Sequence, residues 1–358
     1  MDLQPHEVSL LTELKSKGPK WKGPIQDGIT QSLLNEWLQD PYSAYLSLIL
    51  GLEPEKPEPP YTPDNTLYNL HWGDAFHVGL EYLIHTGDIN IACKEMLTYY
   101  DKTSLLHHPE LSPRSSLFHM LKQYNLNVPY ESTKEWGTEI IFDTLTTPIS
   151  LPCATHLPYR LRGKFDGLSS CREFLAEHKC KKYIDPISLM FEIKQDTQVN
   201  LYLGICGARK VYYDLIKIPD VQSPFSIPVR SGMSTKEFTE KLYYGHCGKY
   251  RGLPISKYTH EWIYQGVFEF MDEQIEHFWQ TTLIPLFHRI NEWYEYVTDE
   301  KFDPLNPECY GPIFYKHPLR TFMPSNTDAF KCKFHSFLTG QDELSDLTEK
   351  DSLFGELE

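Results

Sequence analysis

The sequence has no cysteine pair at C-x-x-C spacing, no internal repeat and no apolar run long enough to cross a membrane. The longest apolar stretch lies around Leu46–Leu50, far short of the roughly 20 residues that a membrane-spanning helix needs. The first residues contain neither a basic nor an apolar segment, so we expect no secretory signal. These absences predict a cytoplasmic protein, in a bacterium or, for a viral protein, in the host cell.

Cysteines are present, but they are scattered. A small disulfide-linked scaffold places its cysteines close together in a short chain, so this spacing excludes that class and predicts reduced thiols. The eight cysteines are Cys93, Cys153, Cys171, Cys180, Cys206, Cys247, Cys309 and Cys332.

Positive charge is scarce: 34 lysines and arginines stand against 49 acidic residues, a net charge of −15. A protein that coats nucleic acid needs an excess of clustered cations, so the balance argues against that class. It allows an enzyme with a local basic groove and fits a protein that gathers carboxylates around divalent metal ions.

The hydrophobic content of 41% and the aromatic content of 14% are ample for a folded core. Proline and glycine interrupt residues 1–27, which we interpret as a flexible arm. We expect one domain over residues 28–340, because no linker separates its helical and β parts. Residues 341–358 are predicted to form an acidic tail.

The hydrophobic period changes along the chain. A helix is expected to begin at Thr30 or Ser32, with a cap from one of these side chains. Two of the predicted strands, 159–167 and 172–179, are joined by a short turn and should form a hairpin. The other expected helices are 65–84, 89–100, 114–125, 190–207, 234–245 and 260–296, and the other strands are 136–142 and 210–217. This order predicts an α/β fold with helical elaborations.

Charged residues meet in the predicted hairpin. Glu177 and Lys179 lie two apart and therefore share a face of their strand, and the hairpin can bring Asp166 beside them. Two carboxylates and an amine suit a Mg²⁺ site that activates water for attack on a phosphate. A solvated charged strand is the alternative reading of this pattern.

Two helices contribute further candidates. Gln198 and Tyr202 are four residues apart on the helix after the hairpin, so their side chains share a face. His77, on an earlier helix, has an imidazole that can ligate a metal.

Together these segments resemble the RecB-like, phage-type branch of the PD-(D/E)XK nuclease superfamily. The resemblance covers residues 28–220 and implies the fold of that family, an α/β core with a small mixed sheet flanked by helices and with helical additions at both ends. Its motifs are Gly73-x-x-x-His77, Gly163-Lys-Phe-Asp166-Gly167, Glu177-His-Lys179, Gln198-x-x-x-Tyr202 and the strand Val211–Lys217.

The resemblance implies metal-dependent cleavage of DNA with one or two Mg²⁺ or Mn²⁺ ions. It assigns catalysis to Asp166, Glu177 and Lys179. Gln198 and Tyr202 would support the site and touch the DNA backbone. The implied metal ligands are His77, Asp166, Glu177 and the backbone carbonyl of His178.

Many relatives hold an iron–sulfur cluster through one early and three late cysteines. Asp40 stands where the early thiol is expected, and only Cys309 and Cys332 lie late in the chain. A cluster needs four thiolates as a rule, so we predict none.

A local basic groove is the remaining requirement for DNA. Ordinary solvation of strand ends is the alternative interpretation of the same cations. The groove residues would be Arg160, Arg162, Lys164, Lys179, Lys181, Lys182, Arg209 and Lys210.

The leading hypothesis is an exonuclease in recombination, repair or phage DNA processing, acting on single-stranded DNA or DNA ends, with a helicase or recombination protein as a possible partner. A structure-specific or nonspecific endonuclease, for example in host defence, is the second. A noncatalytic DNA- or protein-binding member of the fold is the third. We expect no association with a membrane.

Overall fold

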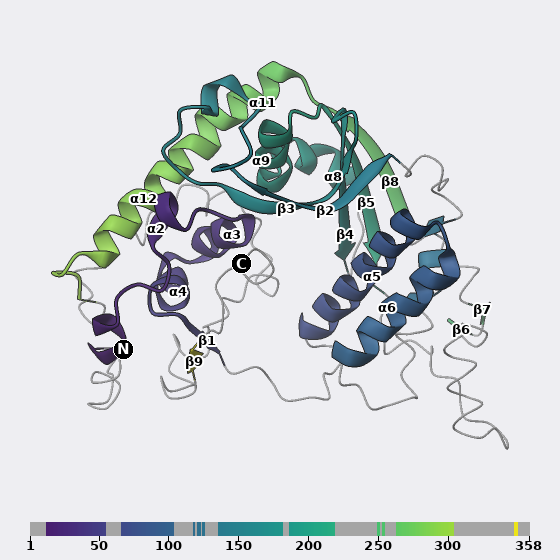
Figure 1. Ribbon diagram of the computed structural model, residues 1–358, viewed down its shortest axis with the longest axis horizontal. Coiled ribbons are helices and arrows are strands. Elements are labelled where there is room, and N and C mark those ends of the chain that lie inside the picture. Colours follow the sequence, from purple (N-terminus) through teal and green to yellow (C-terminus); the bar gives the residue numbers. More distant parts are fainter. Residues whose placement is uncertain are drawn as a thin grey trace. The chain divides into compact units, whose positions relative to one another are not determined.

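A computed structural model describes residues 12–54, 66–103, 117–118, 120–122, 124–125, 135–181, 186–218, 249–250, 253–254, 263–303 and 347–349 (Figure 1). Its α-helices are α2 (Gly23–Gln26), α3 (Gln31–Gln39), α4 (Pro41–Ala44), α5 (Thr66–Thr86), α6 (Ile89–Thr103), α8 (Pro186–Glu192), α9 (Thr197–Cys206), α11 (Asp272–Phe278) and α12 (Ile284–Thr298). Short π-helices span Tyr45–Ile49 and Trp279–Leu283, and short 3-10 helices span Pro152–Ala154 and Ile193–Gln195.

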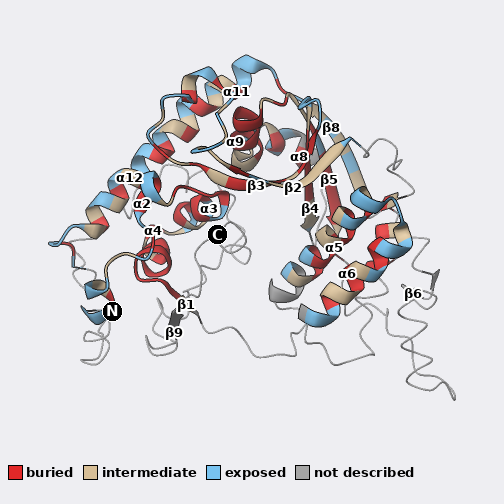
Figure 2. Ribbon diagram, viewed as in Figure 1, coloured by how far each residue is buried: buried red, intermediate tan, exposed pale blue. Residues whose placement is uncertain are grey.

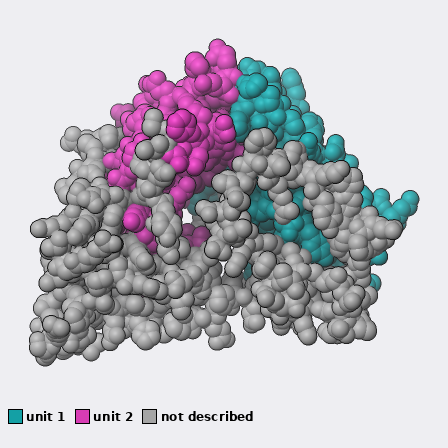
Figure 3. Space-filling view, turned by 180° about the vertical axis from the view of Figure 1, so that it is seen from behind, with its two compact units in different colours: residues 1–56, 141–164, 276–358 teal, residues 57–140, 165–275 magenta. Residues whose placement is uncertain are grey.

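The strands are β1 (Leu52–Pro54), β2 (Trp136–Asp143), β3 (Arg162–Ser169), β4 (Phe174–Lys181), β5 (Lys210–Lys217), β6 (Lys249–Tyr250), β7 (Leu253–Pro254), β8 (Ile263–Glu269) and β9 (Leu347–Glu349). The chain divides into two compact units (Figure 3). Unit 1 comprises residues 1–56, 141–164 and 276–358, and unit 2 comprises residues 57–140 and 165–275. These units are defined by contacts within the fold, and the domain boundaries predicted at residues 28 and 340 stay a prediction.

Tryptophans form the core of unit 1. Trp21 is fully buried, and its ring lies 6.4 Å from that of Trp293, which also contacts Trp37 at 6.4 Å. Gly23 has a φ of +91°, and a Cβ there would lie 2.6 Å from the Tyr294 ring, so glycine is required. The described part of the expected N-terminal arm is therefore packed, since its apolar side chains are needed for this core.

Unit 1 also contains the start of helix α3 and the strand pair β1–β9. Thr30 is the cap of α3, and its hydroxyl accepts a hydrogen bond from the Leu33 amide at 3.2 Å, which confirms the predicted start of this helix. Within the expected acidic tail, β9 pairs antiparallel with β1, with Leu52 opposite Glu349.

An ion pair joins two segments of unit 1 around Asp143. The Nε atom of Arg160 lies 3.0 Å from both carboxylate oxygens of Asp143. The Nε atom of Arg162 also lies 3.7 Å from Oδ2 of Asp143. The hydrogen bonds from Arg160 are the main reason that the pKa of Asp143 is below its ordinary value.

We expect the Asp143→Asn substitution to lower the free energy of unfolding by about 1.5–3 kcal/mol at neutral pH, the usual size for hydrogen bonds to charged groups. Because the folded-state pKa is lowered, this stabilisation is present above the ordinary carboxyl pKa of about 4. It is lost as the pH falls through the lowered pKa. Urea unfolding of both proteins at about pH 7 and about pH 3 measures the difference. A difference that does not shrink between about pH 7 and about pH 3 would contradict this account.

A five-stranded mixed sheet lies at the centre of unit 2, in the order β2-β3-β4-β5-β8 (Figure 1). The strands β3 and β4 are antiparallel, as the predicted hairpin requires. The strands β4 and β5 are parallel, and the chain between them forms α8 and α9. The edge strand β8 runs antiparallel to β5.

Helices cover both faces of this sheet. Helices α5 and α6 share a hydrophobic cluster that includes Phe76 and Met96 from the helices and Ile216 from β5. On the opposite face, α9 is buried from Val199 to Cys206 (Figure 2). Side chains of β4 point alternately to the two faces of the sheet. Cys180 accordingly lies near Gly73 of α5 on one face, and Glu177 contacts Gln198 of α9 on the other. The predicted mixed α/β class is confirmed at this level.

One predicted element is wrong. Residues 260–296 were expected to be helical, but residues 263–269 form β8 and the helices begin at Asp272. In β8 the exposed residues alternate with half-buried ones, as in an edge strand with one solvated face. These residues form a strand because they pair with β5, and a pairing between distant segments cannot be read from the local sequence. The predicted helix 234–245 lies outside the described residues.

Candidate metal and catalytic site

The strands β3 and β4 separate at the predicted motif. Their ladder pairs Leu168 with Leu175 and Gly167 with Ala176, and stops there. The next residue on β3 is Asp166, whose Oδ2 atom accepts a hydrogen bond from the backbone amide of His178 at 2.8 Å. The carboxylate thus satisfies an amide of β4 beyond the end of the ladder.

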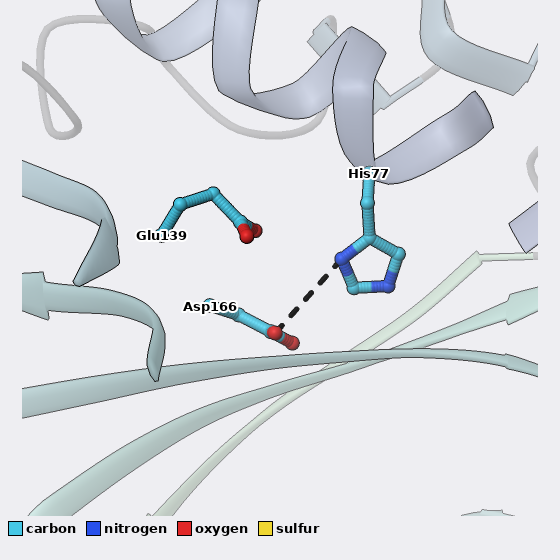
Figure 4. Close-up of side chains that lie close together, drawn as sticks. All are labelled: His77, Glu139 and Asp166. Atoms are coloured by element: carbon cyan, nitrogen blue, oxygen red, sulfur yellow. Dashed lines mark ion pairs between the residues drawn. The ribbon is translucent and has the colours of Figure 1, made fainter. Parts of the chain in front are cut away.

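Three side chains surround a common space beside this separation. His77 of α5, Glu139 of β2 and Asp166 of β3 each offer a ligand atom, and these atoms all lie within 4.8 Å of one another (Figure 4). The Nδ1 atom of His77 is 3.9 Å from Oδ1 of Asp166. One imidazole nitrogen and two carboxylate oxygens are a donor set that suits a divalent cation.

The charge states of these groups also suit a cation. Burial lowers the pKa of His77, which favours the neutral imidazole that ligates metals. Burial by itself raises the pKa of Asp166, but the neighbouring basic groups, namely His77 when it is protonated, His178 and Lys179, lower it overall, which favours the ionised carboxylate.

Glu177 and Lys179 lie on the α9 face of the sheet and are joined by Gln198. The Gln198 side chain accepts a hydrogen bond from the Lys179 ammonium at 2.8 Å and donates one to Oε1 of Glu177 at 2.8 Å. Glu177 and Lys179 also form an ion pair. Their common partner agrees with the strand period, which predicted that they share a face.

The other oxygen of Glu177, Oε2, is buried without a hydrogen-bond partner, and the residue is fully buried. Burial, followed by repulsion from Asp166, raises the pKa of Glu177 to about 8. An unpaired buried carboxylate oxygen is costly, and a bound cation would compensate it. The unpaired oxygen has the chemistry of a cation ligand, but Glu177 is not among the three clustered ligands.

Lys179 has the opposite environment. Burial by itself lowers its pKa, but Glu177 and Asp166 raise it overall. The side chain is therefore an ammonium ion, held in place by two partners.

The supporting residues predicted from sequence lie in different surroundings. Tyr202 is 4% exposed, and its ring packs edge-on against Phe165 at 5.1 Å. Lys181 is exposed at the end of β4. Lys164 belongs to unit 1, as does Arg162, and Lys182 lies outside the described residues. The DNA contacts and the carbonyl ligand of His178 stay predictions.

Several cations of the predicted groove have acidic partners. Arg160 is bound to Asp143, and Lys210 contacts Glu173 at 2.8 Å. Arg209 pairs with Asp272. These pairs reduce the positive potential that was expected from the sequence cluster.

Sequence reasoning missed Glu139, Asp214 and Tyr124. Asp214 accepts hydrogen bonds from the Tyr124 hydroxyl at 2.7 Å and from Nδ1 of His178 at 3.0 Å. A lone carboxylate within the apolar strand around residues 211–217 was a usable signal for Asp214, because buried charges need partners. Glu139 has no such signal. Its φ of +52° is unusual for a strand residue and arises from the tertiary fold.

The five cysteines in the described part of the chain, Cys93, Cys153, Cys171, Cys180 and Cys206, are free thiols. No helix among the described residues has the length and apolar character needed to span a lipid bilayer.

The assembled site combines the half-buried His77, Glu139 and Asp166 group, a donor set that suits a divalent cation, with the buried Glu177 and the Lys179 ammonium. Comparison with known protein families, curated proteins and solved structures gives no match for this chain.

Proposed function

We propose that the protein is a metal-dependent deoxyribonuclease of the RecB-like branch of the PD-(D/E)XK superfamily. The order of elements in unit 2 supports this proposal. Helix α5 precedes the strands β2, β3 and β4, helices α8 and α9 follow, and β5 then pairs parallel to β4. This order agrees with the core that the sequence motifs imply.

The observation that carries the proposal is the environment of Asp166, Glu177 and Lys179 where β3 and β4 separate. Asp166 lies beside His77 and Glu139, while the neighbouring strand supplies a buried carboxylate and an ammonium ion. A charged strand serving only solubility would keep these groups in water, whereas Glu177 is fully buried. Burial of charge at this point favours the catalytic reading.

Each residue then has a definite role. His77, Glu139 and Asp166 would hold a Mg²⁺ or Mn²⁺ ion, and the second oxygen of Glu177 is available to it. Such an ion polarises a phosphodiester and lowers the pKa of a bound water. The Lys179 ammonium orients the attacking water and offsets the negative charge that develops on the phosphate. Its raised pKa favours this role over removal of a proton.

Exonuclease action at DNA ends, in recombination, repair or phage DNA processing, is the form of activity we propose. Here it rests on the family resemblance, as does a helicase or recombination protein as partner. Endonuclease action and a noncatalytic binding role are the alternatives that the same experiment addresses.

The test is digestion of linear and circular DNA, single- and double-stranded, with Mg²⁺, Mn²⁺ or EDTA. We expect loss of linear DNA with either metal, no reaction in EDTA and intact circles. Nicked circles would assign endonuclease activity instead. If no substrate is cut with either metal, the nuclease proposal is wrong.

A further inference from the structure

His178 contacts both sides of the candidate metal site. Its backbone amide donates to Oδ2 of Asp166 at 2.8 Å. Its imidazole ring lies 6.0 Å from the ring of His77, inclined at 72°. A single residue therefore touches two of the three side chains that surround the common space. The contact with Asp166 comes from the His178 backbone and the contact with His77 from its ring, so both depend on how His178 is held.

The His178 side chain is held by Asp214 and, through it, by Tyr124. Its Nδ1 atom lies 3.0 Å from Oδ2 of Asp214, and the same oxygen accepts the Tyr124 hydroxyl at 2.7 Å. The Tyr124 ring packs edge-on against the His178 ring, with centroids 6.0 Å apart. These side chains come from β4, β5 and the segment that carries Tyr124, so they join elements distant in sequence.

The three residues are buried, with exposed fractions of 5% for His178, 3% for Asp214 and 4% for Tyr124. None of the three is among the clustered ligand atoms. A buried polar network of this kind is costly unless all its members are paired, and then it is rigid. An apolar core would stabilise the fold equally well, so the network calls for another explanation.

We propose that Tyr124, Asp214 and His178 form a positioning network that holds Asp166 and His77 in the geometry for metal binding. The inference rests on the metal site of the proposed function and does not depend on which substrate is cleaved. Partners behind metal ligands orient those ligands, and their loss typically weakens metal binding by about 10- to 100-fold.

The test measures Mn²⁺ affinity by electron paramagnetic resonance, with unfolding free energies determined in parallel. His178→Leu removes the imidazole nitrogen, and we expect Mn²⁺ binding about 10- to 100-fold weaker. His178→Asn places an amide near the position of Nδ1 and can still donate to Asp214, but it lacks the ring that contacts His77, so we expect an affinity between those of wild type and His178→Leu. This partial recovery separates the hydrogen bond to Asp214 from simple loss of the imidazole.

A milder pair keeps the test valid if His178→Leu does not fold. Tyr124→Phe removes one hydroxyl from the network, and we expect about 10-fold weaker Mn²⁺ binding, the low end of that range. Tyr159→Phe is the matched control. Its hydroxyl lies 2.6 Å from Nδ1 of His288 in unit 1, so it likewise loses one tyrosine hydroxyl and its hydrogen bond, and it should bind Mn²⁺ as wild type does.

Wild-type Mn²⁺ affinity in His178→Leu or in Tyr124→Phe would overturn the inference. Equal losses in Tyr124→Phe and Tyr159→Phe would overturn it as well, because they would reflect stability alone. Wild-type protein that binds Mn²⁺ and cuts no DNA would overturn the nuclease proposal and leave the network intact. Wild-type protein that binds no Mn²⁺ would overturn both.

Discussion

Replacement of Lys179 by alanine is expected to lower the DNA cleavage rate by about 10²- to 10³-fold, the usual effect of removing one preorganised group that stabilises transition-state charge. The ammonium is well placed for this task. It is held by Gln198 at 2.8 Å and by the Glu177 carboxylate, and its raised pKa favours the charged form. Its loss should leave DNA affinity nearly unchanged, because one cation contributes only part of the phosphate contacts.

The metal affinity of the Lys179→Ala protein is expected to depend on pH, because the lysine affects the protonation of Glu177. Glu177 has a pKa raised to about 8, and the charge of Lys179 opposes that rise. Without the lysine the carboxyl therefore holds its proton to a higher pH, and protons compete with the metal. At about pH 9 this competition is weaker than at neutral pH, so the Mn²⁺ affinity of Lys179→Ala should lie closer to that of wild type than it does at about pH 7.

The measurements for Lys179→Ala are the cleavage rate in Mg²⁺ and DNA affinity in Ca²⁺. Lys94→Ala is a suitable control, since Lys94 is a lysine of α6 whose side chain is 67% exposed. Cleavage at nearly the wild-type rate by Lys179→Ala would show that the Glu177-x-Lys179 match is accidental, and the nuclease proposal would lose its main support.

Replacement of Asp166 by asparagine is expected to abolish cleavage through a different cause, the loss of metal binding. Asp166 is an anionic member of the His77, Glu139 and Asp166 group. Removing a direct anionic ligand should weaken Mn²⁺ binding by more than the roughly 100-fold that loss of an outer partner causes. Asparagine keeps an oxygen that can accept the His178 amide, so the fold should be retained.

Calorimetry of Mn²⁺ binding, together with thermal unfolding, tests this expectation for Asp166→Asn. Glu139→Gln, made in parallel, asks whether the residue that sequence reasoning missed is a ligand as well. A folded Asp166→Asn protein with wild-type Mn²⁺ affinity would exclude Asp166 from the metal site.

The contrast between the two substitutions is informative. Lys179→Ala should separate binding from catalysis, whereas Asp166→Asn should remove both. If Lys179→Ala loses metal binding as completely as Asp166→Asn and a higher pH does not restore it, Lys179 is needed to hold the metal, and a separate role in the reaction is unsupported.

Much of the local structure could be predicted from sequence because it depends on neighbouring residues. Thr30 caps α3 through an amide three residues away, and the strand 210–217 has the predicted bounds. The two-residue period of β4 likewise places Glu177 and Lys179 together, as their common contact with Gln198 shows. These relations are local in the chain, so composition and spacing are sufficient to find them.

Tertiary structure decided the rest. The strand β8 depends on pairing with β5, some 50 residues earlier along the chain, and its own pattern resembled the helix that follows. Glu139 lies beside His77 and Asp166 only in the folded chain, and its φ of +52° is not marked by any local pattern. Asp214 is compatible with a buried strand only because Tyr124 and His178 supply its hydrogen bonds. Sequence alone therefore determined which groups have the chemistry for a metal site, and the three-dimensional pairing of distant segments determined which of them meet, because burial of a charge requires partners that no local pattern specifies.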